Sequence, residues 1–321
     1  MRGLSSSTKG SLVMDGVLVV DKPTGLTSHD VVAHVRRALD TRRIGHIGTL
    51  DPMATGVLPL VIGRATRLAP LLSRGRKVYD GVIRLGVATD TYDITGSVTS
   101  GTLDDGDHDQ PAIDMVAVEA ASHTFIGHII QQPPPFSAKK IRGVRAYKLA
   151  RRRQRVETRA VAVTVHAFEI VSLWGNRLRC RVICDPGFYM RALAHDLGEM
   201  LGCGGCLESL RRECSSTFNL NQSVPLASIE DERRSAAEHI VPLTRLLPEL
   251  PGVVLTDHGR RRAVHGNNVS QADVLSTDGT WRPAEATTES DKVKLYDREG
   301  SLIGIAETNT RSFLHPTIVL V

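Results

Sequence analysis

The chain has 321 residues, of which 41% are hydrophobic and 23% are charged, with a formal net charge of +5 and a pI of about 9.1. This length suits two domains, one large and one small. No apolar run approaches the roughly 20 residues of a membrane-spanning helix, and the polar first residues lack the layout of a secretory signal. We therefore expect a cytoplasmic protein that spans no membrane, with residues 1–14 as a flexible tail.

The charges are distributed unevenly. Arginine clusters at 151–155 (RRRQR) and at 260–262 (RRR), whereas residues 104–109 (DDGDHD) are acidic. Dense basic patches on a mildly basic protein fit binding to a phosphate backbone. The alternative is that these runs are solvated helix faces, and charge alone leaves both interpretations open.

The five cysteines are an odd number in a chain of medium size, which favours free thiols in a reducing compartment. Cys203 and Cys206 form a CxxC pair, but zinc sites usually need a second ligand pair and none is evident. Cys180 and Cys184 have a spacing that suits a strand. The sequence therefore predicts no metal site.

In the first part of the chain, apolar runs predict strands, and the helical spacing of apolar residues after Thr27 or Ser28, either of which could cap, predicts a helix. The expected elements are a strand at 16–23, a helix ending near Leu39, a polar loop at 41–56, a strand at 57–63, the start of a helix at 65–75 and a strand at 77–91.

Further along, proline, glycine and polar clusters separate the predicted elements. We expect an exposed hairpin or disordered connection at 96–113, a helix at 112–127, a basic surface excursion at 131–157, two strands within 160–187 joined by a turn at Gly175–Asn176, a helix at 188–202, loop-like chain at 225–234 and 242–252, and a small all-β domain after Pro251–Gly252.

The most informative stretch is the glycine-rich loop at 42–56, which reads RRIGHIGTLDPMATG. Glycines let the backbone approach a ligand closely, and the proline after Asp51 restricts that residue to an extended or turn conformation. A carboxylate held on such a loop is a candidate nucleophile or base. The alternative is that Asp51 only stabilises a turn, as Asp-Pro pairs often do.

This stretch continues as GHIGTLDPMATGVLPLVIGRATRL and closely resembles the signature of the TruB family of tRNA pseudouridine synthases. Four more segments resemble motifs of that family, and together they cover most of residues 16–215 in the family's order. They are GVLVVDKPTGLTSHDVV, KVYDGVIRLGVATDTYD, QQPPPFSAKKIRGVRAYKLAR and GFYMRALAHDLGEMLGCGGCLESLRR.

The resemblance implies an enzyme that isomerises the T-loop uridine at position 55 of elongator tRNAs. The base is detached from C1′, rotated and reattached through C5, without cofactor or metal. It also implies an α/β fold, with a mixed, mainly antiparallel sheet flanked by helices, the active site in a basic cleft, and a small C-terminal PUA-like domain. Asp51 matches the family's essential aspartate, acting as nucleophile or as base.

Two further catalytic roles follow from the resemblance. Tyr79 matches the tyrosine that stacks on the target base, and its alternative is a core aromatic of a strand. Arg191 matches the arginine that pairs with the catalytic aspartate and orients its carboxylate. Its alternative is an exposed helix arginine.

Four residues match substrate-binding positions of the family. His46 matches the residue that replaces the flipped-out nucleotide, because a stacked base must leave its stack before it can react. Tyr189 matches a second aromatic of the pocket, Leu210 an apolar wall, and Lys22 with Pro23 a support for the catalytic loop. Their alternatives are ordinary loop, helix-start and core residues.

The excursion at 131–157 matches the family's insertion that closes over the T-loop. Its basic side chains could neutralise several phosphates, and RNA loops are read by shape and unstacked bases. The candidates are Lys139, Lys140, Arg142, Arg145, Arg151, Arg152 and Arg153.

The sequence departs from the family's pattern at three places. Phe188 stands where a small polar residue is usual, and Cys206 stands where a histidine is common, which weakens a metal site further. The C-terminal segment resembles the PUA-type domain only faintly, although Arg260–Arg262 would suit docking against the acceptor side of tRNA.

Three functional hypotheses follow. The leading one is a stand-alone tRNA isomerase with residues 15–250 as catalytic domain and 251–321 as PUA-like domain, monomeric, without guide RNA or obligate protein partner. The second is a tRNA-binding folding chaperone, for which Asp51, Tyr79 and Arg191 would not be needed. The third, a guide-RNA-dependent enzyme of a multiprotein particle, would not need its own basic insertion.

Overall fold

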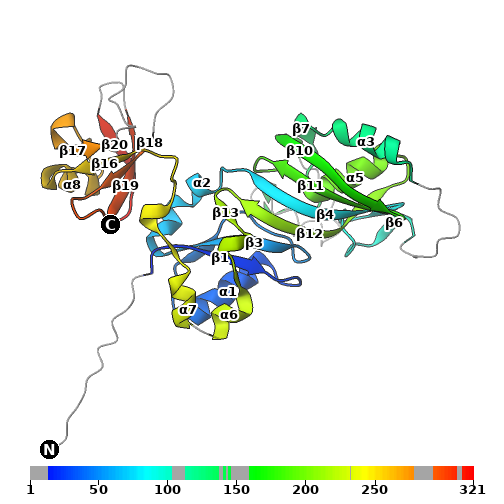
Figure 1. Cartoon of the computed structure of the whole chain (residues 1–321), viewed down its shortest axis with the longest axis horizontal. Helices are drawn as coiled ribbons and strands as arrows, with labels where there is room; N and C mark the ends of the chain where they lie inside the picture. The colour runs from blue at the N-terminus through cyan, green and yellow to red at the C-terminus, as the bar shows by residue number, and fades with distance from the viewer. Residues whose placement is uncertain are drawn as a thin grey trace, which may run out of the picture.

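The computed structural model shows an elongated molecule with a large sheet in its body and a small C-terminal sheet at one end (Figure 1). In the part of the chain that the structure describes, no helix combines the length and the apolar character of a membrane span. The predicted tail falls almost entirely outside the described part, as does the acidic run at 104–109. The structure describes residues 14–102, 113–136, 140–141, 144–145, 159–231, 233–277, 292–308 and 313–321.

The large sheet has eleven strands. Its strand pairs are antiparallel except β1 with β14 and β3 with β12, so the predicted mixed, mainly antiparallel sheet is confirmed. The main path runs β14 (Val224–Pro225), β1 (Gly16–Lys22), β3 (Thr55–Ile62), β12 (Gly205–Ser215), β4 (Lys77–Leu85), β11 (Arg177–Cys184), β10 (Val161–Trp174) and β7 (Gly127–Gln131), with β2 (Ile44–His46), β13 (Phe218–Asn219) and β15 (Val241–Pro242) beside it.

Helix α1 (Ser28–Leu39) begins where the sequence predicts. The side chain of Thr27 accepts from the main-chain nitrogen of Asp30, and the Asp30 carboxylate accepts from that of Thr27, which forms a capping box. Its buried face contains Val31, Val32, Val35 and Leu39. Thr27, and not Ser28, is therefore the cap.

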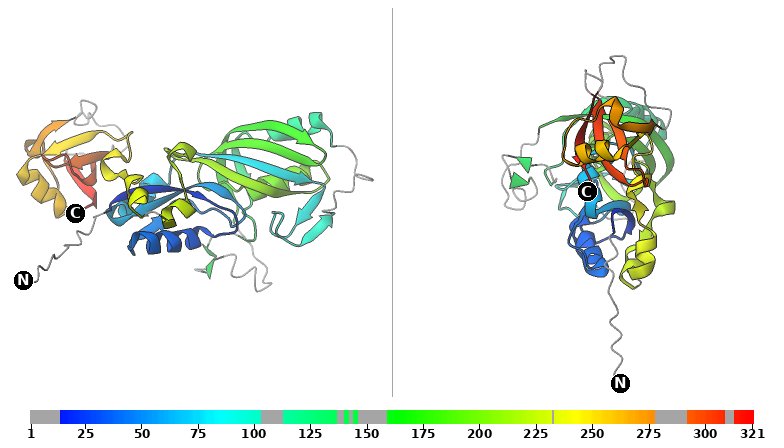
Figure 2. Two further views of the ribbon diagram at one scale, coloured as in Figure 1. Left: turned by 60° about the horizontal axis from the view of Figure 1, so that its bottom comes forward. Right: turned by 90° about the vertical axis from the view of Figure 1, so that its left-hand side faces the viewer.

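Two groups of helices cover the sheet (Figures 1 and 2). Helices α3 (Met115–His123) and α5 (Met190–Met200) lie over the half that contains β10, β11 and β4. Helix α1 lies with α6 (Leu226–Asp231) and α7 (Arg233–Glu238) over the half that contains β1 and β3.

The prediction of loop-like chain at 225–234 is wrong, because α6 occupies most of it. Leu226 and Ile229 are buried and one helical turn apart. A six-residue helix offers too few apolar positions for its period to stand out, and it is stabilised by packing against α1 rather than by local pattern.

Short elements complete the part of the chain before Gly252. Strand β2 lies inside the predicted loop at 41–56, and 65–75 folds as a 3₁₀ helix followed by a single α-helical turn. The strand predicted at 77–91 is interrupted at Gly86. These elements are η1 (Gly63–Leu68), α2 (Ala69–Leu72), β5 (Val87–Thr89), β6 (Val98–Gly101), β8 (Lys140–Ile141), β9 (Val144–Arg145), η2 (Leu220–Gln222) and η3 (Leu243–Arg245).

The second sheet starts at Gly252. The C-terminal segment is not all-β as expected, because α8 contains the arginine run. Thr256 caps α8 by accepting from Gly259, and the arginines lie towards the helix C-terminus, where cations are favoured. The elements are β17 (Val274–Thr277), β16 (Gly252–Leu255), β18 (Lys292–Tyr296), β19 (Leu302–Thr308), β20 (Leu314–Val319), α8 (Asp257–Val264) and η4 (Gln271–Asp273).

An apolar cluster joins the two sheets. Leu302, Ile305 and Leu320 of the C-terminal part share it with Val17 and Leu68 of the body. Burial of these side chains removes apolar surface from water and so favours a fixed arrangement of the two parts.

Candidate active site

The segment between β2 and β3 carries Asp51, and its main chain is held by hydrogen bonds from Lys22 and Ser28. The ammonium of Lys22, which is fully buried, donates to the carbonyl oxygens of Pro52 at 3.1 Å, Ala54 at 2.7 Å and Pro23 at 2.9 Å. The Ser28 hydroxyl donates to the Leu50 carbonyl and accepts from its main-chain nitrogen. Burial lowers the pKa of Lys22 to about 8, although the Asp51 carboxylate opposes this shift.

Arg212 of β12 fixes the same segment from the other side. Its Nε donates to the Val57 carbonyl and its Nη2 to the Gly48 carbonyl, both at 2.8 Å. Gly56 has φ of +97°, and a Cβ there would lie 2.2 Å from the Arg212 carbonyl oxygen. The glycine at position 56 is therefore required both by conformation and by the close approach of β12.

Replacing Gly56 with alanine is expected to destabilise the protein strongly. The left-handed backbone costs about 1–3 kcal/mol for a residue with a side chain, and the clash with β12 adds to it, so we expect a total of at least ~3 kcal/mol. Gly25→Ala is the matched control, because Gly25 has φ of +85° but open space around its Cβ position. Urea unfolding of both variants measures the difference, and equal losses would contradict the packing argument.

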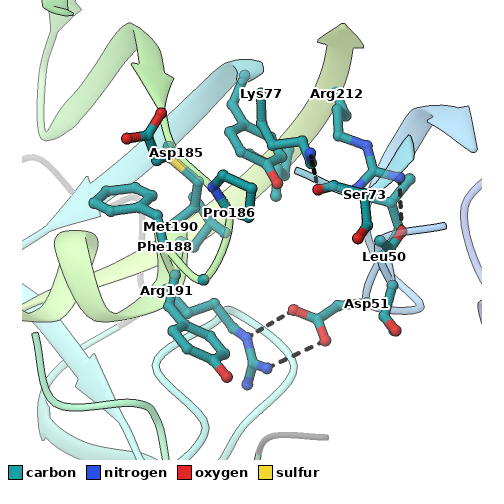
Figure 3. A pocket seen from close by; sticks show the side chains of 17 residues that line it. Leu50, Asp51, Ser73, Lys77, Asp185, Pro186, Phe188, Met190, Arg191 and Arg212 are labelled. Atoms are coloured by element: carbon teal, nitrogen blue, oxygen red, sulfur yellow. Dashed lines mark hydrogen bonds and ion pairs between the residues drawn. The ribbon is translucent and has the colours of Figure 1, made fainter. Parts of the chain in front are cut away.

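The Asp51 carboxylate forms a two-pronged ion pair with Arg191, the second residue of α5. Arg191 Nε lies 2.9 Å from Asp51 Oδ2, and Nη2 lies 3.2 Å from Oδ1 (Figure 3). The Arg191 side chain is only 6% exposed, whereas that of Asp51 is 39% exposed. The buried arginine thus holds a carboxylate that remains open to a ligand.

Arg191 is itself held by three other groups. Nη1 donates to the Thr91 carbonyl at 3.0 Å, and Nη2 donates to the Phe136 carbonyl at 2.8 Å. The Asp93 carboxylate lies 3.6 Å from Nη1 and is itself held by the hydroxyl groups of Thr91 and Thr95. The guanidinium orientation is therefore fixed before any substrate binds.

A cavity of about 330 Å³ opens beside this ion pair (Figure 3). Tyr79, Leu210, Tyr189 and Phe188 supply apolar parts of its lining, and Asp51 lies at its edge. Burial raises the pKa of Tyr79, and the nearby Arg212 guanidinium opposes this only in part. The hydroxyl of Tyr79 therefore remains protonated near neutral pH and can donate a hydrogen bond.

The structure brings most of the predicted catalytic and substrate-binding residues together. Asp51, Tyr79, Tyr189, Arg191 and Leu210 all line the one cavity, although the last is 159 positions from the first. The departure from the family's pattern also falls here, because the bulky Phe188 replaces a small polar side chain at the cavity wall.

Two predicted binding residues lie outside the cavity lining. Lys22 lies beneath the loop, as described above. His46 ends β2, where its Nε2 lies 3.2 Å from Thr49 Oγ1 and its ring meets that of His29 edge-on at 5.4 Å. His46 therefore lies beside the loop that carries Asp51 rather than in the pocket.

Within the basic excursion at 131–157, the structure describes residues 131–136 and the β8–β9 hairpin, and the hairpin projects away from the body (Figure 2). Lys140 and Arg145 lie on this hairpin. The remaining candidates, Lys139, Arg142, Arg151, Arg152 and Arg153, lie outside the described residues.

Sequence reasoning missed two cations of the cavity. Lys77 starts β4 and is 5% exposed, and Arg212 is 1% exposed. The signal was available, because side chains two apart on a strand share a face. Lys77 is two positions from Tyr79, and Arg212 is two positions from Leu210, so both cations face the same side as recognised pocket residues.

The surroundings of the buried cysteines make their thiols unreactive. All five cysteines are free, and burial raises the pKa of Cys180, Cys184 and Cys206 to about 12. Such thiols are poor nucleophiles at neutral pH. In the described part of the chain, no group of three or more His, Cys, Asp or Glu residues is arranged to hold a metal ion.

The chain matches known proteins over most of its length. Residues 36–190 match the model of the TruB family pseudouridylate synthase N-terminal domain, and 191–248 match that of the tRNA pseudouridylate synthase B C-terminal domain. A tRNA pseudouridine synthase B of Solibacter usitatus is 41% identical over 96% of this chain and 100% of its own. That of Geobacter sulfurreducens is 39% identical over 92% of this chain and 94% of its own.

Solved structures show the same fold. The chain is similar to one from the archaeal box H/ACA sRNP Nop10-Cbf5 complex, with a TM-score of 0.69, 23% identity, and 96% of this chain and 87% of that chain covered. A chain of an H/ACA RNP bound to a substrate RNA containing 2′-deoxyuridine gives a TM-score of 0.70 at 22% identity, with 96% and 86% covered. The family models and the bacterial relatives together show that this chain belongs to the TruB family of pseudouridylate synthases.

Proposed function

We propose that this chain converts uridine to pseudouridine at position 55 in the T-loop of tRNA, with Asp51 as the catalytic carboxylate. One observation carries the proposal: Asp51 is half-exposed at the edge of a base-sized cavity and is held by the buried Arg191. The TruB relatives named as tRNA pseudouridine synthases support the choice of tRNA as substrate.

The lining of the cavity suits a uracil base lifted out of the RNA. A flipped nucleotide is commonly held by stacking and by hydrogen bonds to its edges. Tyr79 offers an aromatic face with a protonated hydroxyl, Leu210 an apolar wall and Tyr189 a second aromatic ring. In this proposal His46, at the end of β2, fills the gap that the nucleotide leaves in its loop.

The reaction rearranges one glycosidic bond and changes no oxidation state, so in this proposal it needs neither cofactor nor metal. Asp51 either attacks the sugar or abstracts a sugar proton. Lys22 keeps the loop in place in both cases, because two of its three hydrogen bonds fix the main chain on either side of Met53.

We extend the proposal to the domains and the partners. Residues 15–250 form the catalytic domain with 131–157 as its RNA-clasping insertion, and 251–321 form a PUA-like domain whose α8 docks against the acceptor side of tRNA. The protein acts as a monomer in the cytoplasm, without guide RNA or obligate protein partner, since the basic insertion serves as its own clasp.

Removing the arginines of the insertion is expected to weaken tRNA binding and its salt dependence. The binding constant K falls as salt rises, and each lost phosphate contact makes the slope of log K against log salt less negative by ~0.7–0.9. Changing Arg151, Arg152 and Arg153 together to alanine should therefore reduce the magnitude of this slope by about 2. Filter binding to tRNA between low and moderate salt measures this slope.

The matched control changes three arginines of β11 that already have carboxylate partners. Arg177, Arg179 and Arg181 pair with Glu208, Asp80 and Glu213. Their replacement should leave the salt slope unchanged within about half a unit. An unchanged slope in the insertion variant would contradict the clasp.

The position of modification tests the proposal itself. Purified protein alone is incubated with an unmodified tRNA transcript, and pseudouridine is mapped by carbodiimide modification and reverse transcription. We expect one stop at position 55, absent from a transcript with cytidine there. Modification elsewhere, or only with added guide RNA, would contradict the proposed substrate.

A further inference from the structure

Two buried cations occupy the wall of the cavity that faces the ion pair. In Figure 3, Lys77 and Arg212 lie on one side of the open space, and Asp51 with Arg191 lies on the other. Lys77 comes from β4 and Arg212 from β12, which are paired neighbours in the sheet. The roles proposed so far for the catalytic residues make no use of Lys77.

Among the described residues, no carboxylate forms an ion pair with either cation. The Lys77 ammonium donates to the main-chain carbonyls of Ser73, at 3.2 Å, and Gly75. Arg212 donates to the carbonyls of Gly48 and Val57 and interacts with the hydroxyl of Tyr79. A buried charge without a counter-ion is costly, and two of them side by side repel each other. An anion inside the cavity would relieve both costs.

The proposed reaction creates such an anion. When the bond between C1′ and N1 breaks, its electron pair stays on the base, and the negative charge spreads from N1 over O2 and O4. If Asp51 attacks, its oxygen forms the new bond to C1′. If Asp51 instead removes the proton from C2′, that electron pair becomes the C1′–C2′ double bond. Both routes leave one negative charge on the detached uracil.

We propose that Lys77 is a further catalytic residue, whose ammonium, with Arg212 behind it, stabilises the uracil anion until C5 attacks the sugar. This inference rests on the proposed function. Tyr79 shares its face of β4 with Lys77, so a base stacked on that ring presents its edge to the ammonium. Preorganised donors aimed at developing charge are among the largest contributions to enzymatic rate.

The surroundings of Lys77 suit this role. Burial, together with the nearby Arg212 guanidinium, lowers the pKa of the Lys77 ammonium to about 8, whereas Cys184, Cys214 and Asp185 oppose the shift. The group is therefore charged at neutral pH but holds its proton more loosely than an ordinary lysine. A more acidic donor gives a stronger hydrogen bond to a delocalised anion.

The test compares two leaving groups. Wild type and Lys77→Met are each given tRNA that carries either uridine or 5-fluorouridine at the target position. The single-turnover rate of glycosidic bond breakage is measured by chromatography and mass spectrometry of the digested nucleosides. We expect Lys77→Met to slow the uridine reaction by about 10²-fold, as for removal of one oxyanion donor. The loss on 5-fluorouridine should be at least ~10-fold smaller, because fluorine itself stabilises the base anion.

Three results would overturn the inference. Equal losses on both substrates would show that Lys77 only shapes the pocket. Weaker tRNA binding with an unchanged rate would assign the cations to a phosphate. Full activity of Lys77→Met would remove the role altogether. Lys77→Arg is the rescue variant, which keeps the charge and should recover part of the uridine rate. Wild-type conversion of uridine in the same experiment separates failure of this inference from failure of the proposed function.

Discussion

Asp51→Ala is expected to lower the rate of pseudouridine formation by about 10⁴-fold or more, the loss typical when the reacting group itself is removed. Binding of tRNA should change by no more than a few-fold. The reason is structural: Arg191 keeps its bonds to the carbonyls of Thr91 and Phe136 and its proximity to Asp93, so the cavity remains formed. Nucleoside chromatography after single-turnover incubation measures the rate, and filter binding measures affinity.

Asp51→Asn is the matched control for shape. It keeps the size of the side chain and one acceptor for Arg191 but has neither a nucleophilic carboxylate nor a base. We expect the same loss of rate as for alanine. An asparagine variant that retains more than about a hundredth of the activity would assign the chemistry to another group.

Arg191→Met is expected to have two effects, one on rate and one on stability. The rate should fall by about 10³-fold, because Asp51 loses the two-pronged contact that fixes its orientation. The free energy of unfolding should fall by about 3–5 kcal/mol, because Asp93, whose side chain is 8% exposed, then loses its buried cationic neighbour. Chemical denaturation and single-turnover kinetics measure the two effects separately.

Arg191→Lys separates orientation from charge. The lysine retains a cation near Asp93 but cannot form two parallel bonds to the Asp51 carboxylate or reach both carbonyls at once. We expect it to recover a large part of the stability and little of the rate. Recovery of both would show that Arg191 acts only as a charge.

Much of the fold before Gly252 could be predicted from local patterns. The apolar run of β1, the spacing of the buried face of α1 and the turn between β10 and β11 each carry a period or a breaker that physical rules recognise. The hairpin turns where expected, at Gly175 and Asn176, between Trp174 and Arg177. Each of these elements buries one face, so apolar residues recur along the sequence with the period of the strand or helix.

Elements without such a period were missed. Strand β2 has only three residues inside a glycine-rich loop and exists because it pairs with β3. Helix α8 was not predicted because it lacks an apolar period. Three of its eight residues are arginines, and its buried residues are only Gly259 and Ala263. Tertiary pairing or capping, rather than propensity, determines both.

The candidate site shows the same division. The resemblance to the family supplied Asp51, Tyr79 and Arg191, but not the contacts that hold them. Arg191 is bound by carbonyls 100 and 55 positions earlier in the chain. Such contacts depend on topology, which no local pattern reveals. The buried cations Lys77 and Arg212 could have been predicted, because each is a charged residue at a position of its strand that shares a face with buried apolar residues.

Tritium release from [5-³H]uridine-labelled tRNA by the purified protein alone tests the proposed isomerisation most directly. Reattachment through C5 expels the hydrogen on that carbon, so isomerisation must release label. We expect release approaching one equivalent per tRNA with wild type and none with Asp51→Ala at equal binding. No release from correctly folded tRNA, with binding intact, would contradict it and favour a tRNA-binding folding chaperone instead.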